Sequence, residues 1–226
     1  MMSTIREERL GVIFDLDGVL LDSYEMHFEC WSAIAKEYSI EITRTQFDSL
    51  FGRMGREIAQ TIWGSELGAE EVFSIHRRKQ ALFRENLQLD FPAMDGAVEL
   101  IDALVEAGFV LSVGSSAPPE NVKMSLKGLG RTKSFSALAT GDEVACGKPD
   151  PQVFLLAAQR MGLNPAKCAV IEDAPVGIEA ALASGMTAIA IARTTSADRL
   201  RQAHLVVVSL RELTPERIGD LIRAQH

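Results

Sequence analysis

The feature that most constrains the fold is a series of short runs in which nearly every residue is apolar. Continuous apolarity, rather than strict alternation with polar residues, is typical of strands that are buried on both faces of a parallel sheet. The runs are Gly11–Asp15, Val110–Gly114, Ser136–Ala139, Ala169–Glu172, Thr187–Ala192 and Leu205–Val208. We therefore expect a parallel sheet at the centre of the protein.

Helical segments are predicted between the later runs, and glycines follow four of them at the position where helices commonly end. These glycines are Gly108, Gly130, Gly162 and Gly185. The predicted helices are Asp95–Ala107, Pro119–Leu129, Pro151–Met161, Val176–Ser184 and Ser196–Ala203, and a further packing helix is expected beyond Arg211. Strands that alternate with helices predict an α/β fold with a Rossmann-like parallel sheet and right-handed crossovers.

The interval between the first and second strands is too long for one crossover helix. Its apolar pattern predicts several helices instead, at Tyr24–Tyr38, Arg44–Leu50, Arg56–Trp63 and Ala69–Asn86. We therefore predict a core domain made of residues 1–22 and 91–226, and an inserted four-helix-type cap domain made of residues 23–90.

The net charge, the apolar runs and the cysteines indicate which binding partners and which cellular location to expect. The chain carries 23 Lys and Arg against 31 Asp and Glu, a formal charge of −8, and it has no basic cluster, so we expect no nucleic-acid partner. No apolar run is long enough to span a bilayer and the first residues lack a signal-like apolar segment, so we expect no membrane partner. Cys30, Cys146 and Cys168 are far apart, which predicts free thiols and a cytoplasmic location. A monomer and a dimer are both open.

Polar residues follow four consecutive predicted strands. The first strand ends in Asp15-Leu16-Asp17-Gly18, and the second is followed by Ser115 and Ser116. Lys148 lies after the third strand, and the fourth ends in Glu172-Asp173. Ligands of open α/β sheets bind at the carboxyl ends of the strands, so we expect these side chains to meet at one edge.

The acidic residues in this set require a cation, because carboxylates crowded at one edge repel one another. Mg²⁺ prefers oxygen ligands and keeps water molecules that a phosphate can replace. Lys148 and the Ser115 hydroxyl would bind the remaining phosphoryl oxygens. The composition of the edge therefore predicts a phosphoryl-transfer site that uses Mg²⁺.

The four segments resemble the four motifs of the haloacid dehalogenase superfamily. The resemblance rests on Asp15-Leu16-Asp17-Gly18-Val19-Leu20, Ser115, Gly147-Lys148-Pro149 and Glu172-Asp173, and the length and position of the insert resemble the subfamily with a helical cap. The segment from Asp22 to Trp31 resembles the group that contains beta-phosphoglucomutase and sugar-phosphate phosphatases.

This resemblance implies a two-step reaction in which Asp15 forms an aspartyl-phosphate. Asp17 would protonate the leaving oxygen and then take a proton from water or from a second substrate. Ser115, the backbone N–H of Ser116 and Lys148 would bind the phosphoryl group. The implied Mg²⁺ ligands are Asp15, the Asp17 carbonyl, Glu172 and Asp173. Asp17 itself excludes the dehalogenases and the phosphonate-cleaving members, which lack an acid at that position.

Candidate substrate-binding residues lie in the predicted cap. Lys79 falls on an apolar helical stripe, either as a lysine that reaches solvent at the stripe edge or as a cation that faces the site. His27 is either a packed histidine or, by resemblance, a hinge histidine that organises the closed site. Arg53 and Arg56 lie in a segment that resembles the specificity loop. His76 and its two arginine neighbours are interpreted as a solvated helix face.

Three functions compete at this point. The first is a Mg²⁺-dependent phosphatase that acts on a small phosphorylated metabolite, with a sugar phosphate preferred. The second is a beta-phosphoglucomutase, in which a sugar hydroxyl rather than water accepts the phosphoryl group. The third is a binding protein built on an inactive phosphatase fold, and the complete motif set argues against it.

Overall fold

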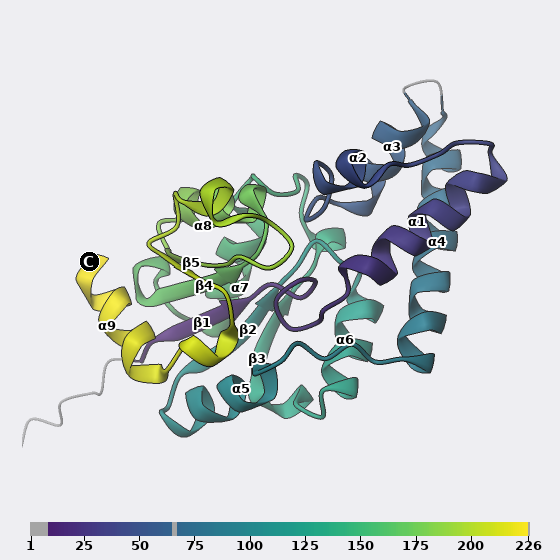
Figure 1. Ribbon diagram of the computed structural model, residues 1–226. Coiled ribbons are helices and arrows are strands. Elements are labelled where there is room, and N and C mark those ends of the chain that lie inside the picture. Colours follow the sequence, from purple (N-terminus) through teal and green to yellow (C-terminus); the bar gives the residue numbers. More distant parts are fainter. Residues whose placement is uncertain (1–8, 65–66, 226) are drawn as a thin grey trace, which may run out of the picture.

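The computed structural model describes residues 9–64 and 67–225 and contains a six-stranded sheet whose neighbouring strands are all parallel (Figure 1). The strand order is β3-β2-β1-β4-β5-β6, so the chain moves outward from β1 to β3 and then returns to the other side of β1. This order confirms the predicted α/β class. The direction in which successive strands are added to the sheet reverses between β1 and β4, and open α/β sheets bind ligands at such a reversal. The strands are β1 Gly11–Phe14, β2 Val110–Gly114, β3 Phe135–Ala139, β4 Cys168–Glu172, β5 Thr187–Ile191 and β6 Leu205–Val207.

Both faces of the sheet are covered, which explains the continuous apolar runs. In β1, Val12 and Phe14 belong to one apolar cluster and Ile13 belongs to the other, and none of the three is exposed. Successive side chains of a strand point to opposite faces, so a strand buried on both sides must be apolar throughout. The first cluster includes side chains of α5 Ala97–Glu106, α6 Pro119–Gly128 and α9 Pro215–Gln225, and the second includes those of α7 Gln152–Met161 and α8 Pro175–Ala183.

The glycines that were expected to end helices do so with positive φ angles, between 67° and 83°. The predicted helix Ser196–Ala203 is wrong, since only a short 3-10 turn, Ala197–Leu200, forms there. The stretch offers the core one fully buried apolar side chain, Leu200, which is too little to hold a helix by packing. His204 has already returned to the sheet, because its ring Nδ1 accepts from the Ala188 N–H at 2.9 Å.

The segment between β1 and α5 is helical, as predicted, and projects from the carboxyl end of the sheet (Figure 1). We call residues 23–90 the cap and the other described residues the core. The cap has an apolar cluster of its own that includes Trp31, Phe47 and Ile75. This separate cluster supports the proposal that the cap is a second domain. Its helices are α1 Tyr24–Glu37, α2 Arg44–Asp48, α3 Gly55–Trp63 and α4 Ala69–Leu89.

The two linkers between core and cap run side by side. The Asp22 N–H donates to the Pro92 carbonyl at 2.8 Å, and the Met94 N–H donates to the Leu20 carbonyl at 3.0 Å. Leu21 and Ala93 form an antiparallel bridge between them. The chain therefore enters and leaves the cap through one narrow double connection.

Two expectations from composition can be compared with the described residues. Cys30 and Cys168 are buried and Cys146 is exposed, and all three are free thiols, as predicted. Within residues 9–64 and 67–225, none of the helices combines the length and the apolarity that crossing a membrane requires.

Candidate active site

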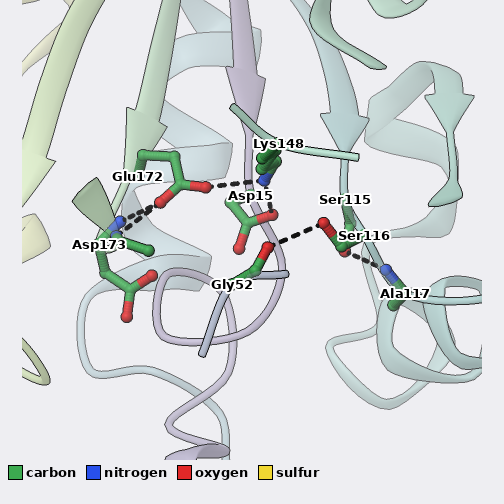
Figure 2. Close-up of polar contacts among 9 residues, drawn as sticks. Asp15, Gly52, Ser115, Ser116, Ala117, Lys148, Glu172 and Asp173 are labelled. Atoms are coloured by element: carbon green, nitrogen blue, oxygen red, sulfur yellow. Dashed lines mark hydrogen bonds and ion pairs between the residues drawn. The ribbon is translucent and has the colours of Figure 1, made fainter. Parts of the chain in front are cut away.

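The parallel sheet brings the predicted polar residues to one edge because three neighbouring strands end there. Asp15 follows β1, Ser115 follows β2, and Glu172 ends β4, and these strands are adjacent in the order β2-β1-β4. Lys148 arrives from the loop that follows β3. Figure 2 shows Lys148, Asp15 and Glu172 pointing toward one another from these separate segments.

Lys148 joins two carboxylates in the interior. Its Nζ lies 2.6 Å from Asp15 Oδ1 and 2.7 Å from Glu172 Oε1, and its side chain is almost completely buried. Burial alone would lower the pKa of Lys148, but the two carboxylates outweigh it and raise the pKa above its ordinary value. The lysine is therefore a permanent cation at the centre of the site.

The carboxylates of Asp15, Glu172 and Asp173 form a buried cluster in which one oxygen atom from each residue lies within 4.8 Å of the other two. Burial, opposed by Lys148 and reinforced by Glu172, raises the pKa of Asp15 to about 7. Burial together with Glu172 and Asp15 also raises the pKa of Asp173 well above its usual range. One lysine therefore does not compensate the three acids, and their ionised forms are disfavoured without a further cation.

The donor set fits Mg²⁺ on two observations. The cluster consists of hard carboxylate oxygens, which Mg²⁺ prefers. In addition, Asp173 Oδ1 is buried and has no hydrogen-bond partner among the described residues, a costly arrangement unless it faces a ligand. Glu172 is more fully engaged, because its Oε2 accepts from the N–H groups of Asp173 and Ala174, both at 2.7 Å.

Asp17 lies in the opposite electrostatic environment to Asp15, as expected from their spacing. Its Oδ1 accepts from the Ser23 hydroxyl at 2.7 Å and lies 2.9 Å from His27 Nε2. Burial alone would raise the pKa of Asp17, but His27, Ser23 and Lys79 together lower it to about 2. Asp17 is thus held in its ionised form, whereas the protonated form of Asp15 is favoured.

His27 and Lys79 come from different cap helices and meet beside Asp17. Lys79 Nζ contacts His27 Nδ1, and the His27 ring stacks on Phe83 with ring centres 4.1 Å apart. Lys79 is 1% exposed, so the prediction that it faces the site is supported and the alternative of a lysine reaching solvent is wrong. Burial lowers the pKa of Lys79 to about 8, although Cys30 and Asp17 oppose the shift.

The two serines after β2 make different contacts. The Ser115 hydroxyl oxygen accepts from the Ala117 N–H at 3.0 Å, which leaves its own proton available for a phosphoryl oxygen. The Ser116 hydroxyl donates to the Gly52 carbonyl of the cap at 2.9 Å (Figure 2). Ser116 therefore holds the cap against the core in addition to its predicted backbone role.

The two cap arginines occupy different pockets. Arg53 lines the pocket that also contains Asp15, Asp17 and Ser115, and its side chain is exposed. Arg56 lines a neighbouring pocket of about 400 Å³ and donates to the Ala145 carbonyl of the core at 2.9 Å. A substrate-binding role for either arginine stays a prediction, and the position of Arg53 favours it more directly.

Sequence reasoning missed Ser23 and Thr194, and it misjudged His76. Ser23 stands where a helix-capping residue is expected before α1, yet its hydroxyl binds Asp17 instead of the helix. Thr194 lies in the loop after β5, three residues beyond the strand end, and donates to Asp173 Oδ2 at 2.5 Å, so a search of that whole loop was needed to find it. Arg77 and Arg78 are exposed, as interpreted, but His76 is half-buried, because α3 packs beside it and its Nε2 lies 2.9 Å from Gln80 Nε2.

The strand order, the buried Lys148 and the paired acids Asp15 and Asp17 are together typical of one class of protein. This class is the phosphoryl-handling enzymes with an α/β core and an inserted helical cap. The chain belongs to the haloacid dehalogenase-like hydrolase family, whose model matches residues 12–191. The resemblance seen in the sequence motifs is thereby confirmed over most of the chain.

Individual relatives fall into two kinds of phosphoryl chemistry. A beta-phosphoglucomutase from Bacillus subtilis is 32% identical, with 93% of this chain and 94% of that protein covered. A fructose-1-phosphate phosphatase from Escherichia coli is also 32% identical, with 81% and 96% covered. Among solved structures, a beta-phosphoglucomutase from Clostridium difficile has a TM-score of 0.88 at 25% identity, covering 96% of this chain and 98% of that one.

Proposed function

We propose that this protein is a Mg²⁺-dependent phosphatase that hydrolyses a small phosphorylated metabolite, preferably a sugar phosphate, through an aspartyl-phosphate on Asp15. The observation that carries the proposal is the pair Asp15 and Asp17, two residues apart and held in opposite electrostatic environments next to Lys148. Acid–base chemistry requires such a split between neighbouring carboxylates. The named activities of the relatives support the substrate class.

In the first step, an Asp15 carboxylate oxygen attacks phosphorus and the bond to the substrate oxygen breaks. Asp17 gives a proton to that leaving oxygen. Asp17 is ionised in the arrangement seen here, and a phosphate dianion beside it raises its pKa, so that it gains its proton as the substrate binds. The Ser115 hydroxyl and Lys148 bind the phosphoryl oxygens throughout.

In the second step, Asp17 takes a proton from a water molecule, whose oxygen attacks the phosphorus of the aspartyl-phosphate. Inorganic phosphate leaves and the Asp15 carboxylate is restored, so the atoms balance. Asp15, Asp173, Glu172 and the Asp17 carbonyl are the residues that would hold Mg²⁺. When bound, the ion neutralises charge on the phosphoryl oxygens and on the acidic cluster.

The cap controls access to this chemistry. The cavity left between cap and core beside Asp15 is about 40 Å³, which accommodates a few water molecules but no sugar phosphate. Contacts such as Ser116 to Gly52 and Asn121 to Gln80 hold the two parts together. We infer that the structure is the closed arrangement and that the cap moves away to admit substrate.

The experiment that tests the proposal measures inorganic phosphate released from a panel of phosphorylated sugars and other small metabolites, with Mg²⁺ and with EDTA. We expect release from one sugar phosphate far above the rest, abolished by EDTA and by Asp15→Asn. An unchanged rate in Asp15→Asn would discard the mechanism. No release from any compound would favour the mutase or an inactive binding protein.

The second candidate, a beta-phosphoglucomutase, is favoured by one observation of its own. Arg53 lines the pocket without an ion pair to any described residue, so it is available to a second phosphate on the far side of a sugar. The position of Arg56 outside this pocket reduces the number of cations there and favours hydrolysis. Conversion of beta-glucose 1-phosphate in the presence of catalytic bisphosphate would identify the mutase.

The expected setting of the enzyme also belongs to this proposal. We keep a cytoplasmic location, the absence of nucleic-acid and membrane partners and an open choice between monomer and dimer. The free thiols and the acidic net charge of −8 support the first two of these expectations.

A further inference from the structure

The loop after β5 reaches the acidic cluster from a side that the four motif segments do not cover. β5 ends at Ile191 beside β4, and the chain then passes through Arg193 and Thr194. The Thr194 hydroxyl donates to Asp173 Oδ2 at 2.5 Å. Thr194 therefore contacts one of the residues that would hold Mg²⁺.

This contact uses one oxygen of Asp173 and leaves the other for a ligand. Asp173 Oδ1 is buried without a partner among the described residues, whereas Oδ2 is held by Thr194. Gly18 closes the other side of Oδ2, because a Cβ atom at Gly18 would lie 1.9 Å from it. The carboxylate is therefore confined between a backbone and a hydroxyl.

The loop itself is anchored independently of Asp173. The Ala192 N–H donates to the Val207 carbonyl at 2.8 Å, and the Arg193 N–H donates to the Ile191 carbonyl at 3.2 Å. The Arg193 guanidinium lies 3.0 Å from Asp22 in the first linker to the cap. Thr194 is thus presented to Asp173 from a segment whose two preceding residues are anchored, one to β6 and the other to the first linker.

We propose that Thr194 is a positioning residue that orients Asp173 toward a divalent cation. Without the hydroxyl, repulsion from Glu172 and Asp15 would turn the Asp173 carboxylate away, and the cation would have to reorder it on binding. The inference rests on the proposed function only in that the site holds Mg²⁺. It does not depend on which phosphorylated compound is the substrate.

The test compares Thr194→Val with two matched variants. Valine keeps the shape of threonine but has no hydroxyl, whereas Thr194→Ser keeps the hydroxyl. Thr195→Val makes the same change one residue along, at a side chain that forms no hydrogen bond within the described residues. Mg²⁺ affinity is measured by calorimetry, and the Mg²⁺-induced rise in melting temperature provides a second measurement on the same proteins.

We expect Thr194→Val to bind Mg²⁺ about 10- to 100-fold more weakly, as is typical when a partner of a metal ligand is removed. Thr194→Ser and Thr195→Val should retain the affinity of the unaltered protein. If Thr194→Val lowers the melting temperature equally with and without Mg²⁺ while its affinity is unchanged, Thr194 is merely structural and the proposal is wrong. If the unaltered protein binds no Mg²⁺, the proposed cofactor fails as well, which separates the two failures.

Discussion

The sheet edge and the cap supply polar side chains to the same pocket, but they hold those side chains in different ways. Asp15 and Glu172 stand at the ends of adjacent strands, so backbone pairing alone places them together. His27 and Lys79 lie on two helices, 52 residues apart, and meet only because α1 packs on α4. The proposed catalytic residues are therefore positioned by the topology of the core, and the proposed substrate-binding residues by side-chain packing in the cap.

The difference matters because a side chain placed by a strand end and a side chain placed by helix packing respond differently to substitutions nearby. A strand end keeps its place as long as the sheet forms, whereas a helix face rotates or shifts when its packing changes. Substitutions in the cap should therefore alter which substrate is used, while substitutions at the sheet edge should affect every substrate alike.

The largest effect is expected when the attacking carboxylate is removed. Asp15→Asn should lower phosphate release at least about 10⁴-fold for every substrate, because no nucleophile remains. Lys79→Met in the cap should lower it only about 10- to 100-fold and unequally among substrates. Steady-state rates over the substrate panel check both, and an equal loss in the two variants would contradict the division of roles.

A buried glycine on α8 provides a second test on the core side. Gly177→Ala would bring a Cβ atom to 1.9 Å from Glu172 Oε1, which displaces Glu172 and through it Lys148. Although alanine usually stabilises a helix, we expect this change to lower the free energy of unfolding by about 1–3 kcal/mol.

The matched control for this substitution lies on α9. Gly219→Ala meets only the flexible end of Arg223, no closer than 3.2 Å, and should raise stability by about 0.5–1 kcal/mol. Urea unfolding of the two variants gives the comparison. A stabilised Gly177→Ala would show that Glu172 moves without cost.

Core and cap should respond to acid in opposite directions when Mg²⁺ is removed. Burial, with Lys79, Arg56 and Arg84, lowers the pKa of His76 in the cap to about 4, so the unfolded chain binds a proton between pH 6.5 and 4 that the folded cap does not. Cap stability should therefore fall by about 3 kcal/mol as pH drops through this range. The raised pKa of Asp15 has the opposite sign, so the core gains stability between pH 7 and 3.8.

Tryptophan fluorescence separates these two responses, because both tryptophans of the chain, Trp31 and Trp63, lie in the cap. In EDTA, the urea midpoint by fluorescence should fall on acidification, and His76→Gln should reduce that fall; His27, whose pKa burial also lowers, contributes with the same sign. Far-ultraviolet circular dichroism, which also reports the core, should shift less. Coincident shifts by both probes at each pH would mean that cap and core unfold as one unit.

The smallest effect is expected at the contact between the two regions. Asn121 on α6 donates to Gln80 Oε1 at 2.8 Å and accepts from Arg84 at 3.1 Å, which joins the core to α4. Asn121→Leu should lower kcat/KM about tenfold, corresponding to about 1–2 kcal/mol for two lost hydrogen bonds in the closed state. Lys123→Ala, on the exposed side of the same helix, should leave kcat/KM unchanged.

Most of the core site could be predicted from the sequence because its logic is local. Each apolar run identifies a strand, and the residue after it falls at the ligand-binding edge. Asp15, Ser115 and Asp173 follow this rule directly. Thr194 lies three residues beyond the end of β5, outside this rule, and it carries no charge, so no direct signal for it is present in the sequence.

The cap could be predicted only in outline. The helical stripe indicated that Lys79 turns inward, but periodicity does not specify which helix covers a face. His76 shows the limit. Its position on α4 suggested a solvated side chain, but Gly55 of α3 packs beside the ring so closely that a Cβ atom at Gly55 would lie 2.4 Å from it. Such contacts depend on tertiary packing between two helices, whereas hydrophobic periodicity describes each helix by itself.

The paired linkers have a consequence for how such enzymes diversify. Because Asp22 and Pro92 are hydrogen-bonded neighbours, the ends of the cap lie as close together as the ends of a hairpin. A different insert with similarly spaced ends could occupy the same position without changing the strands that carry Asp15 and Asp173. If the proposed function holds, a replaced cap would change which substrate is bound while the phosphoryl site at the sheet edge stays the same.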